Sequence, residues 1–262
     1  MLKIVQIYKK LGETPLQALE RFRADMIVNE PSGASLWRQV PMTYAGRLDP
    51  MAEGQLIILI GDECKNKEKY LGLDKEYEVE IVFGIDTDTY DALGLATLQE
   101  SAKNIDKIEF DKLDLQKYAG KFIQEYPAYS SKTFNGKQLH TLARAGKLPD
   151  GITEEMPTKE VEIYDIKKLD VYEASAKDLL VRITSMIDLV GSDFRQDQIK
   201  RRWNEVLCGH GQASTQIPSH FTVLKCLIKC SSGTYMRSLA NKIGHDLGVG
   251  GFAIAIKRTR IG

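Results

Sequence analysis

The carboxylate of Asp49 lies just before a continuous apolar run. Residues 44–54 place glycines and a proline around Asp49, and residues 55–61 then read Gln-Leu-Ile-Ile-Leu-Ile-Gly. Such a run predicts a strand buried in the core. A carboxylate on a loop that enters a core strand is held in place and partly shielded from water, which suits an acid that attacks or abstracts a proton. Asp-Pro and glycine also favour an ordinary turn, so these residues alone leave both interpretations open.

Further segments of the chain have the patterns of strands. Residues 75–84 alternate between an apolar face that carries Tyr77 and a face of glutamates, as in a half-buried strand. Residues 223–230 place Cys226 and Cys230 on one buried face, as the period of two in a strand requires. The remaining predicted strands are residues 3–8, 159–172 and 179–184.

Helices are predicted between these strands. Thr14 offers an N-cap, and Pro15 follows at the first helical position. Another helix begins near Met236 and ends at Gly248. Polar helices are predicted at residues 99–124 and 193–206, and a loop at residues 29–41. Because strands and helices mix without strict alternation, the pattern favours an α+β sheet protein.

The composition argues against several classes of protein. Lys and Arg total 36 and Asp and Glu total 36 in 262 residues, so the chain is not a uniformly basic nucleic-acid binder, although a local basic groove stays open. The four cysteines include no CxxC pair, so a zinc site is not expected. The sequence has neither a signal-peptide pattern nor an apolar run that could span a membrane. We therefore expect a cytoplasmic protein in a reducing compartment.

Two side chains have both a structural and a functional interpretation. Arg237 is predicted in the first turn of a helix, where a cation opposes the helix dipole. It therefore needs a carboxylate or a phosphate as partner, unless it is simply solvated. Tyr77 is predicted on the apolar face of its strand, either as a core tyrosine or as a platform on which a flipped-out base stacks.

Two basic segments are candidates for contact with RNA. Aromatic residues are interleaved with lysines and arginines over residues 126–147, which include Lys137 and Arg144. This composition suits single-stranded or loop RNA, although solvated helices carry it too. Lys257 and Arg258 begin a short basic patch at the C-terminal end of the sequence, and such a patch can meet phosphates.

Taken together and in this order, these segments resemble the TruB family of tRNA pseudouridine synthases. The motifs that carry the resemblance lie at residues 9–15, 43–54, 75–94, 127–146 and 233–258. The resemblance implies a pseudouridine synthase fold, with a mixed, mainly antiparallel central sheet flanked by helices. We expect the chain to lack the small C-terminal PUA-like domain that is common in bacterial members, and the resemblance implies one catalytic domain over residues 1–262. Within it, residues 99–150 are expected to be an insertion that grips RNA, and residues 185–220 an unassigned insertion.

The resemblance also implies a reaction. A uridine of tRNA, in the T-arm at position 55, is flipped into a pocket, and Asp49 starts to break its C1′–N1 bond as nucleophile or as base. Arg237 pairs with Asp49. The residues that match the family's pocket are Tyr77, which stacks on the base, Tyr235, which lines the pocket, and Ile256, which packs near the base. No cofactor or metal is needed, because the released uracil is itself the returning nucleophile, and we expect the protein to be a monomer.

The chain departs from the family pattern at two positions beside Asp49. Tyr44 stands where the family has a histidine that helps to hold the opened RNA loop, so stacking is retained without imidazole chemistry. Arg47 stands where the family has threonine. We expect Arg47 to insert where the flipped base was, or to contact a phosphate.

Two other functions remain open at the level of sequence. One is a non-catalytic tRNA-binding or folding chaperone on the same scaffold, which would tolerate the loss of Asp49, Tyr77 or Arg237. The other is a nucleoside hydrolase or glycosylase, which would normally use a second carboxylate or a metal cluster. Product analysis separates the latter from an isomerase, because hydrolysis releases free uracil.

Overall fold

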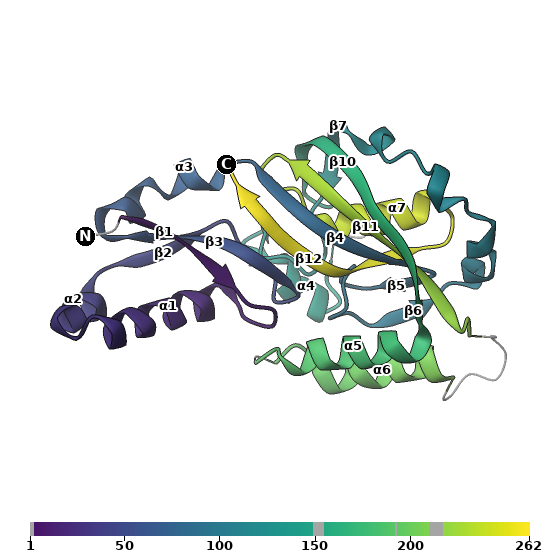
Figure 1. The fold of residues 1–262 in the computed structure, drawn as a ribbon, viewed down its shortest axis with the longest axis horizontal. Helices are drawn as coiled ribbons and strands as arrows, with labels where there is room; N and C mark the ends of the chain where they lie inside the picture. The colour runs from purple at the N-terminus through teal and green to yellow at the C-terminus, as the bar shows by residue number, and fades with distance from the viewer. Residues whose placement is uncertain (1–2, 149–154, 192, 210–216) are drawn as a thin grey trace.

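The computed structural model describes residues 3–148, 155–191, 193–209 and 217–262. Their main sheet has eight strands, in the order β1-β3-β12-β4-β11-β10-β7, with β2 also paired to β3. The pair formed by β3 and β12 is parallel, and the other pairs of this sheet are antiparallel. Figure 1 shows the strands crossing most of the molecule, with helices beside them. The predicted α+β fold with a mixed, mainly antiparallel sheet is confirmed.

The segments directly before and after Asp49 both belong to strands of the main sheet. The strands of this sheet are β1 (Ile4–Lys9), β2 (Met42–Ala45), β3 (Ala52–Ile60), β4 (Lys75–Phe83), β7 (Gly120–Glu125), β10 (Thr158–Ser175), β11 (His220–Cys230) and β12 (Gly251–Ile261). Two small sheets pair β5 (Ile85–Thr87) with β6 (Ala96–Leu98), and β8 (Thr133–Phe134) with β9 (Lys137–Gln138). Asp49 therefore lies in the loop between β2 and β3.

The helices of the described residues are mostly short. They are α1 (Pro15–Asn29), α2 (Ala34–Gln39), α3 (Lys67–Leu71), α4 (Leu139–Arg144), α5 (Ala176–Asp188), α6 (Gln196–Cys208) and α7 (Met236–Asp246). Thr14 caps α1 as predicted, in a reciprocal capping box with Gln17. None of the helices in the described parts of the chain has the length and apolar composition needed to cross a membrane.

Three predicted elements are wrong, each for a physical reason. Residues 99–124 form 3₁₀ turns and then β7 instead of a helix, because Ile105, Phe110 and Tyr118 are buried by packing on the sheet. Residues 179–184 belong to α5, whose buried residues recur at helical spacing over a longer window. The predicted loop at residues 29–41 contains α2, which buries Trp37.

The central strands send alternate side chains into two separate cores. Ile81 of β4 packs in a cluster with Leu239 of α7, whereas its neighbour Val82 packs in a cluster with Ile183 of α5 and Trp203 of α6. Because successive side chains of a strand point to opposite faces, α7 covers one face of the sheet and α5 and α6 cover the other. Figure 1 shows α5 and α6 lying side by side as a hairpin.

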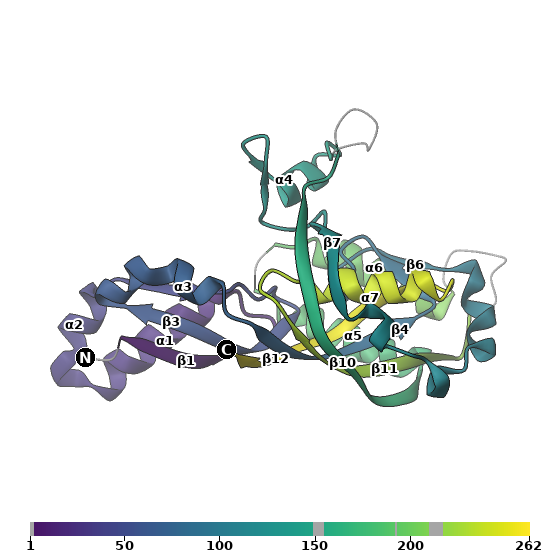
Figure 2. The ribbon, with the colours of Figure 1, turned by 90° about the horizontal axis from the view of Figure 1, so that it is seen from above.

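The chain between β7 and β10 leaves the sheet. Figure 2 shows the part that carries α4 projecting from one face of the sheet. Residues 99–118, by contrast, lie against the sheet through buried side chains. The expected RNA-gripping insertion at residues 99–150 is therefore structurally divided, and its projecting part, here called the arm, comprises residues 126–147.

Candidate active site

A buried arginine of β12 holds the loop that carries Asp49. Arg258 of β12 donates to the carbonyl oxygens of Gln55 (2.7 Å), Gly46 (3.1 Å) and Arg47 (3.4 Å). Only 1% of Arg258 is exposed. The guanidinium of Arg258 is therefore used inside the protein, where it also lines the cavity described below, and the expectation that Arg258 contacts RNA stays a prediction.

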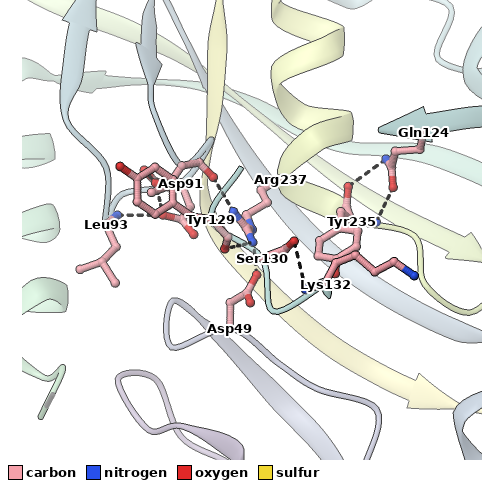
Figure 3. Close-up of polar contacts among 10 residues, drawn as sticks. Asp49, Asp91, Leu93, Gln124, Tyr129, Ser130, Lys132, Tyr235 and Arg237 are labelled. Atoms are coloured by element: carbon pink, nitrogen blue, oxygen red, sulfur yellow. Dashed lines mark hydrogen bonds and ion pairs between the residues drawn. The ribbon is translucent and has the colours of Figure 1, made fainter. Parts of the chain in front are cut away.

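Asp49 forms an ion pair with Arg237, which enters from the first turn of α7. Nε of Arg237 lies 2.8 Å from Oδ2 of Asp49. The other guanidinium nitrogens donate to the carbonyl oxygens of Thr89 (2.8 Å) and Tyr129 (3.0 Å). Arg237 is only 2% exposed, whereas 39% of the Asp49 side chain is accessible. Arg237 thus fixes one edge of a carboxylate whose other side is open (Figure 3).

A second carboxylate, Asp91, lies near the same arginine. Its Oδ1 accepts hydrogen bonds from the Thr89 hydroxyl (2.7 Å) and the Leu93 backbone N–H (2.9 Å). Burial raises the pKa of Asp91 to about 6. Burial alone would lower the pKa of Arg237, but the charges of Asp49 and Asp91 raise it. In the sequence, Asp91 belongs to a family motif, and nothing in its local pattern indicates that its charge acts on Arg237 across the fold.

Asp49 borders a cavity of about 620 Å³ that also contains the predicted base-binding residues. Tyr77, Tyr235 and Ile256 line this cavity. Burial, followed by the charge of Asp49, raises the pKa of Tyr235 to about 12, and burial also raises the pKa of Tyr77. Both hydroxyl groups are therefore neutral donors at pH 7. Cavities of this size accommodate small ligands or single nucleotides.

Tyr235 is held firmly at the edge of this cavity. Its backbone N–H donates to the side chain of Gln124 (2.8 Å), whose amide donates back to the Tyr235 carbonyl (3.3 Å). The ring meets Tyr126 edge to face at 5.8 Å, and Nζ of Lys132 lies 5.0 Å from the centre of the Tyr126 ring. The arm thus supplies part of the cavity wall, through Tyr126 and Lys132 among others.

Tyr44 and Arg47 lie differently from the base-binding residues. Tyr44 borders a second cavity of about 460 Å³, on the other side of Asp49, and Lys67 lies 5.3 Å from the centre of its ring. Arg47 is exposed and borders both cavities. Asp49 and Arg237 therefore stand between two adjoining hollows, of which one holds Tyr77 and the other Tyr44.

Three of the four predicted phosphate-binding side chains are at the surface. Lys137 and Arg144 are exposed on the arm, and Lys257 is exposed on β12. Arg144 also contacts residues beyond the arm, since it donates to the Asp193 carbonyl oxygen at 3.3 Å. The structure thus gives these three cations access to a bound polymer, whereas Arg258 is buried.

Two buried lysines near the Asp49 loop were missed by sequence reasoning. Lys9 is 0% exposed and donates to the Ala52 (2.5 Å) and Lys10 (3.1 Å) carbonyl oxygens. Lys75 is also buried and donates to the carbonyl oxygens of Leu71 and Leu73. Burial lowers the pKa of each lysine to about 8. Together with Arg258, these lysines put positive charge next to the Asp49 loop. The only sequence signal for them is that each lysine stands at an end of a strand.

The described residues contain no cluster of His, Cys, Asp or Glu side chains that could hold a metal ion. What the site offers instead is one accessible carboxylate, one buried guanidinium and neutral tyrosine hydroxyls around a cavity. These groups can attack or deprotonate a bound molecule, stabilise charge and stack on a planar ring.

Comparisons with known proteins agree with this geometry. A family model described as TruB family pseudouridylate synthase (N terminal domain) matches residues 36–186. The tRNA pseudouridine synthase B proteins of Francisella tularensis subsp. holarctica (strain FTNF002-00 / FTA) and Francisella philomiragia subsp. philomiragia are each 33% identical to the chain, over 221 and 223 residues. These alignments cover 84% of the chain and 55% of each relative. The chain thus spans about half the length of the curated relatives it matches.

A solved structure supports the fold. The crystal structure of a Cbf5-Nop10-Gar1 complex contains a chain that superposes with a TM-score of 0.52 at 15% sequence identity, covering 99% of this chain and 49% of that one. At this identity the superposition speaks for the architecture alone. The family model, by contrast, rests on sequence and covers more than half of the 262 residues. The chain therefore belongs to the TruB family of pseudouridylate synthases.

Proposed function

We propose that the protein isomerises a flipped-out uridine of tRNA to pseudouridine, at position 55 in the T-loop, with Asp49 as the catalytic carboxylate. The observation that carries the proposal is the ion pair between Asp49 and Arg237 at the wall of the cavity that holds Tyr77 and Tyr235. The relatives named tRNA pseudouridine synthase B support tRNA as the substrate.

The chemistry requires one well-placed carboxylate. An oxygen of Asp49 acts on the ribose and the C1′–N1 bond breaks. The uracil then turns within the cavity, and a new bond forms between C1′ and C5. C5 loses its proton and N1 gains one, so product and substrate have the same mass. Arg237 orients the carboxylate through the 2.8 Å contact while the free face of Asp49 meets the ribose.

The residues that line the cavity have the chemistry that a detached uracil needs. Tyr77 offers a ring for stacking, and Ile256 packs against the same base from β12. Tyr235 contributes a hydroxyl that stays neutral, since burial and then the charge of Asp49 raise its pKa. Holding the base between such walls prevents its loss to solvent between bond cleavage and bond formation.

The arm and the Asp49 loop are proposed to hold the RNA around this cavity. Lys137 and Arg144 project with the arm, and Lys257 lies on β12, so all three can meet phosphates of the T-arm. Tyr44 and Arg47 border the adjoining hollow, where a ring and a guanidinium suit unpaired nucleotides beside the flipped uridine.

The proposal is tested with purified protein and an unmodified tRNA transcript, without added metal, followed by carbodiimide mapping of pseudouridine. One new pseudouridine in the T-loop is expected, and none with Asp49→Asn, because the amide cannot replace the carboxylate as nucleophile or base. Binding of tRNA should survive in Asp49→Asn. Activity retained by that variant would refute the assignment. Binding without product in the wild type would favour the non-catalytic chaperone, and free uracil a hydrolase.

A further inference from the structure

The residues that precede α6 make a set of contacts outside the stretch that the family model covers. Arg195 donates from Nη2 to Oδ2 of Asp88 at 3.0 Å, and its guanidinium lies 4.8 Å from the centre of the Tyr129 ring. Asp88 belongs to the β5–β6 connection and Tyr129 to the arm. One side chain therefore ties together two segments that are about 40 residues apart in sequence.

A second contact joins the same short segment to the arm. Arg144 of the arm lies with its guanidinium 5.8 Å from the centre of the Phe194 ring and donates to the Asp193 carbonyl oxygen at 3.3 Å. Within the arm, the His140 ring contacts the Ser130 carbonyl oxygen at 3.1 Å. The arm is thus docked on residues 193–195 at two points, near Tyr129 and near Arg144.

The two segments that Arg195 joins are the ones that hold Arg237. The Thr89 carbonyl, next to Asp88, and the Tyr129 carbonyl accept the two Nη donors of Arg237. The remaining donor, Nε, binds Asp49. If the arm moved away from Arg195, Arg237 would no longer reach the Tyr129 carbonyl and would be free to tilt within its buried site.

The helix that follows Arg195, α6, is fixed to the β5–β6 region by hydrogen bonds. Trp203 of α6 donates its indole N–H to the Ala92 carbonyl at 3.0 Å, and Arg202 donates to the Ala96 carbonyl at 2.7 Å. These bonds fix α6 to the same β5–β6 region that contains Asp88. Arg195 itself has a φ of 66°, a left-handed conformation that is rare outside glycine and is commonly found where a side chain must be aimed.

We propose that residues 193–195 form a clasp for the arm and that Arg195 is a positioning residue for the ion pair between Arg237 and Asp49. The inference rests on the proposed function, since the ion pair is taken as catalytic. The clasp couples docking of the arm to assembly of the site. When the arm is docked on residues 193–195, the Tyr129 carbonyl oxygen accepts the third hydrogen bond of Arg237.

The test compares Arg195→Gln, which removes the charge and weakens the stacking, with Arg195→Lys, which can keep the Asp88 contact. Arg201→Gln on the exposed face of α6 is the matched control, because Arg201 bonds only to a carbonyl oxygen of its own helix in the structure as described. Melting temperatures are measured first, and only variants folded at the assay temperature are compared.

Two measurements need no RNA. Tryptic cleavage at the lysines and arginine of the arm should be several-fold faster in Arg195→Gln, intermediate in Arg195→Lys and unchanged in Arg201→Gln. The Nε–H NMR resonance of Arg237, assigned by its change in Asp49→Asn, should shift in Arg195→Gln but not in the control. An arm as protected as in the wild type together with an unshifted Arg237 resonance would overturn the proposal.

The third measurement is the single-turnover rate of pseudouridine formation at saturating enzyme. Arg195→Gln should lower this rate about tenfold while the Kd for tRNA changes less than about threefold. A defect that saturating enzyme removes would mean that Arg195 contacts the RNA directly, which contradicts a positioning role. If the wild type formed no pseudouridine, the proposed function would fail, while the cleavage and NMR contrasts would still decide whether the clasp exists.

Discussion

At the residue scale, the centre of the site is a guanidinium with three oriented bonds. Arg237 donates hydrogen bonds to Asp49, Thr89 and Tyr129, and it is almost completely buried. A planar fork can satisfy three acceptors in fixed directions, whereas the ammonium of lysine is a compact charge on a flexible stem. The function of Arg237 therefore depends on its shape as well as on its charge.

Arg237→Lys is expected to fold but to lose most activity. Because one ammonium cannot reach all three oxygens, the Asp49 carboxylate should lose its orientation and kcat should fall on the order of 100-fold. Arg260→Lys, on the exposed part of β12, is the control and should stay near wild type. Multiple-turnover assays on unmodified tRNA give both values, and equal activity of the two variants would contradict the role given to the fork.

The buried Lys9 predicts a specific dependence of stability on pH. Burial lowers its pKa to about 8 in the folded protein, against 10.5 for the ordinary side chain. Below pH 8 the folded state thus carries a charged lysine at a desolvation cost. Between pH 8 and about 10.5 the unfolded state binds more protons, so stability rises with pH, by up to about 3 kcal/mol from this group.

Lys9→Met removes this contribution. The free energy of unfolding of the wild type relative to Lys9→Met should therefore increase between pH 7 and pH 10, as measured by urea unfolding at each pH. Lys3→Met, at an exposed position, should show no such trend relative to the wild type. A difference between wild type and Lys9→Met that is the same at both pH values would mean that the folded pKa of Lys9 is not lowered.

At the scale of elements, strands with a clear alternation were predicted well and other elements less so. Residues 75–83 form β4, as the predicted strand at residues 75–84 required, because one apolar and one acidic face leave little choice of register. Residues 99–124 are charged enough to suggest a helix, yet contacts with the sheet hold them as 3₁₀ turns and β7. A window of six residues at 179–184 was too short to distinguish a strand from α5.

The parallel pair of β3 and β12 depends on a glycine. Gly54 has a φ of 114°, and a Cβ at this position would collide with the backbone of Arg258 opposite. Gly54→Ala is expected to lower the free energy of unfolding by about 2 kcal/mol or more. Gly72→Ala has space and an ordinary φ, so it should change stability far less. Equal urea midpoints for the two variants would contradict this account.

At the scale of the whole molecule, the balance of charges matters for RNA. The formal net charge is zero, so attraction for a polyanion must come from local groups of exposed cations. Lys137 and Lys257 are two such cations, whereas Lys9, Lys75 and Arg258 are buried and bonded to carbonyl oxygens. A modest dependence of tRNA affinity on salt is expected for the wild type.

Lys137→Gln and Lys257→Gln should each weaken tRNA binding. Each should also reduce the steepness of log Kd against log salt by about 0.7–0.9 for every phosphate that the lysine neutralises in the wild type. Lys112→Gln, an exposed position paired with Glu109 on the surface, is the control and should leave the slope unchanged. Filter binding at salt concentrations from low to moderate measures this slope for each variant. A slope unaffected by either variant would remove that lysine from the RNA interface.

The sequence by itself determined the strands with clear periodicity, the α+β class and the family, because these depend on local periodicity and on motifs in order along the chain. It also singled out Asp49, Tyr77 and Arg237. Only the tertiary structure decided that Arg258 bonds to the Asp49 loop, that the charge of Asp91 acts on Arg237, and that Arg195 contacts the arm. Each of these interactions joins residues far apart in sequence, and burial, which assigns a cation to the surface or to the core, exists only once the chain has folded.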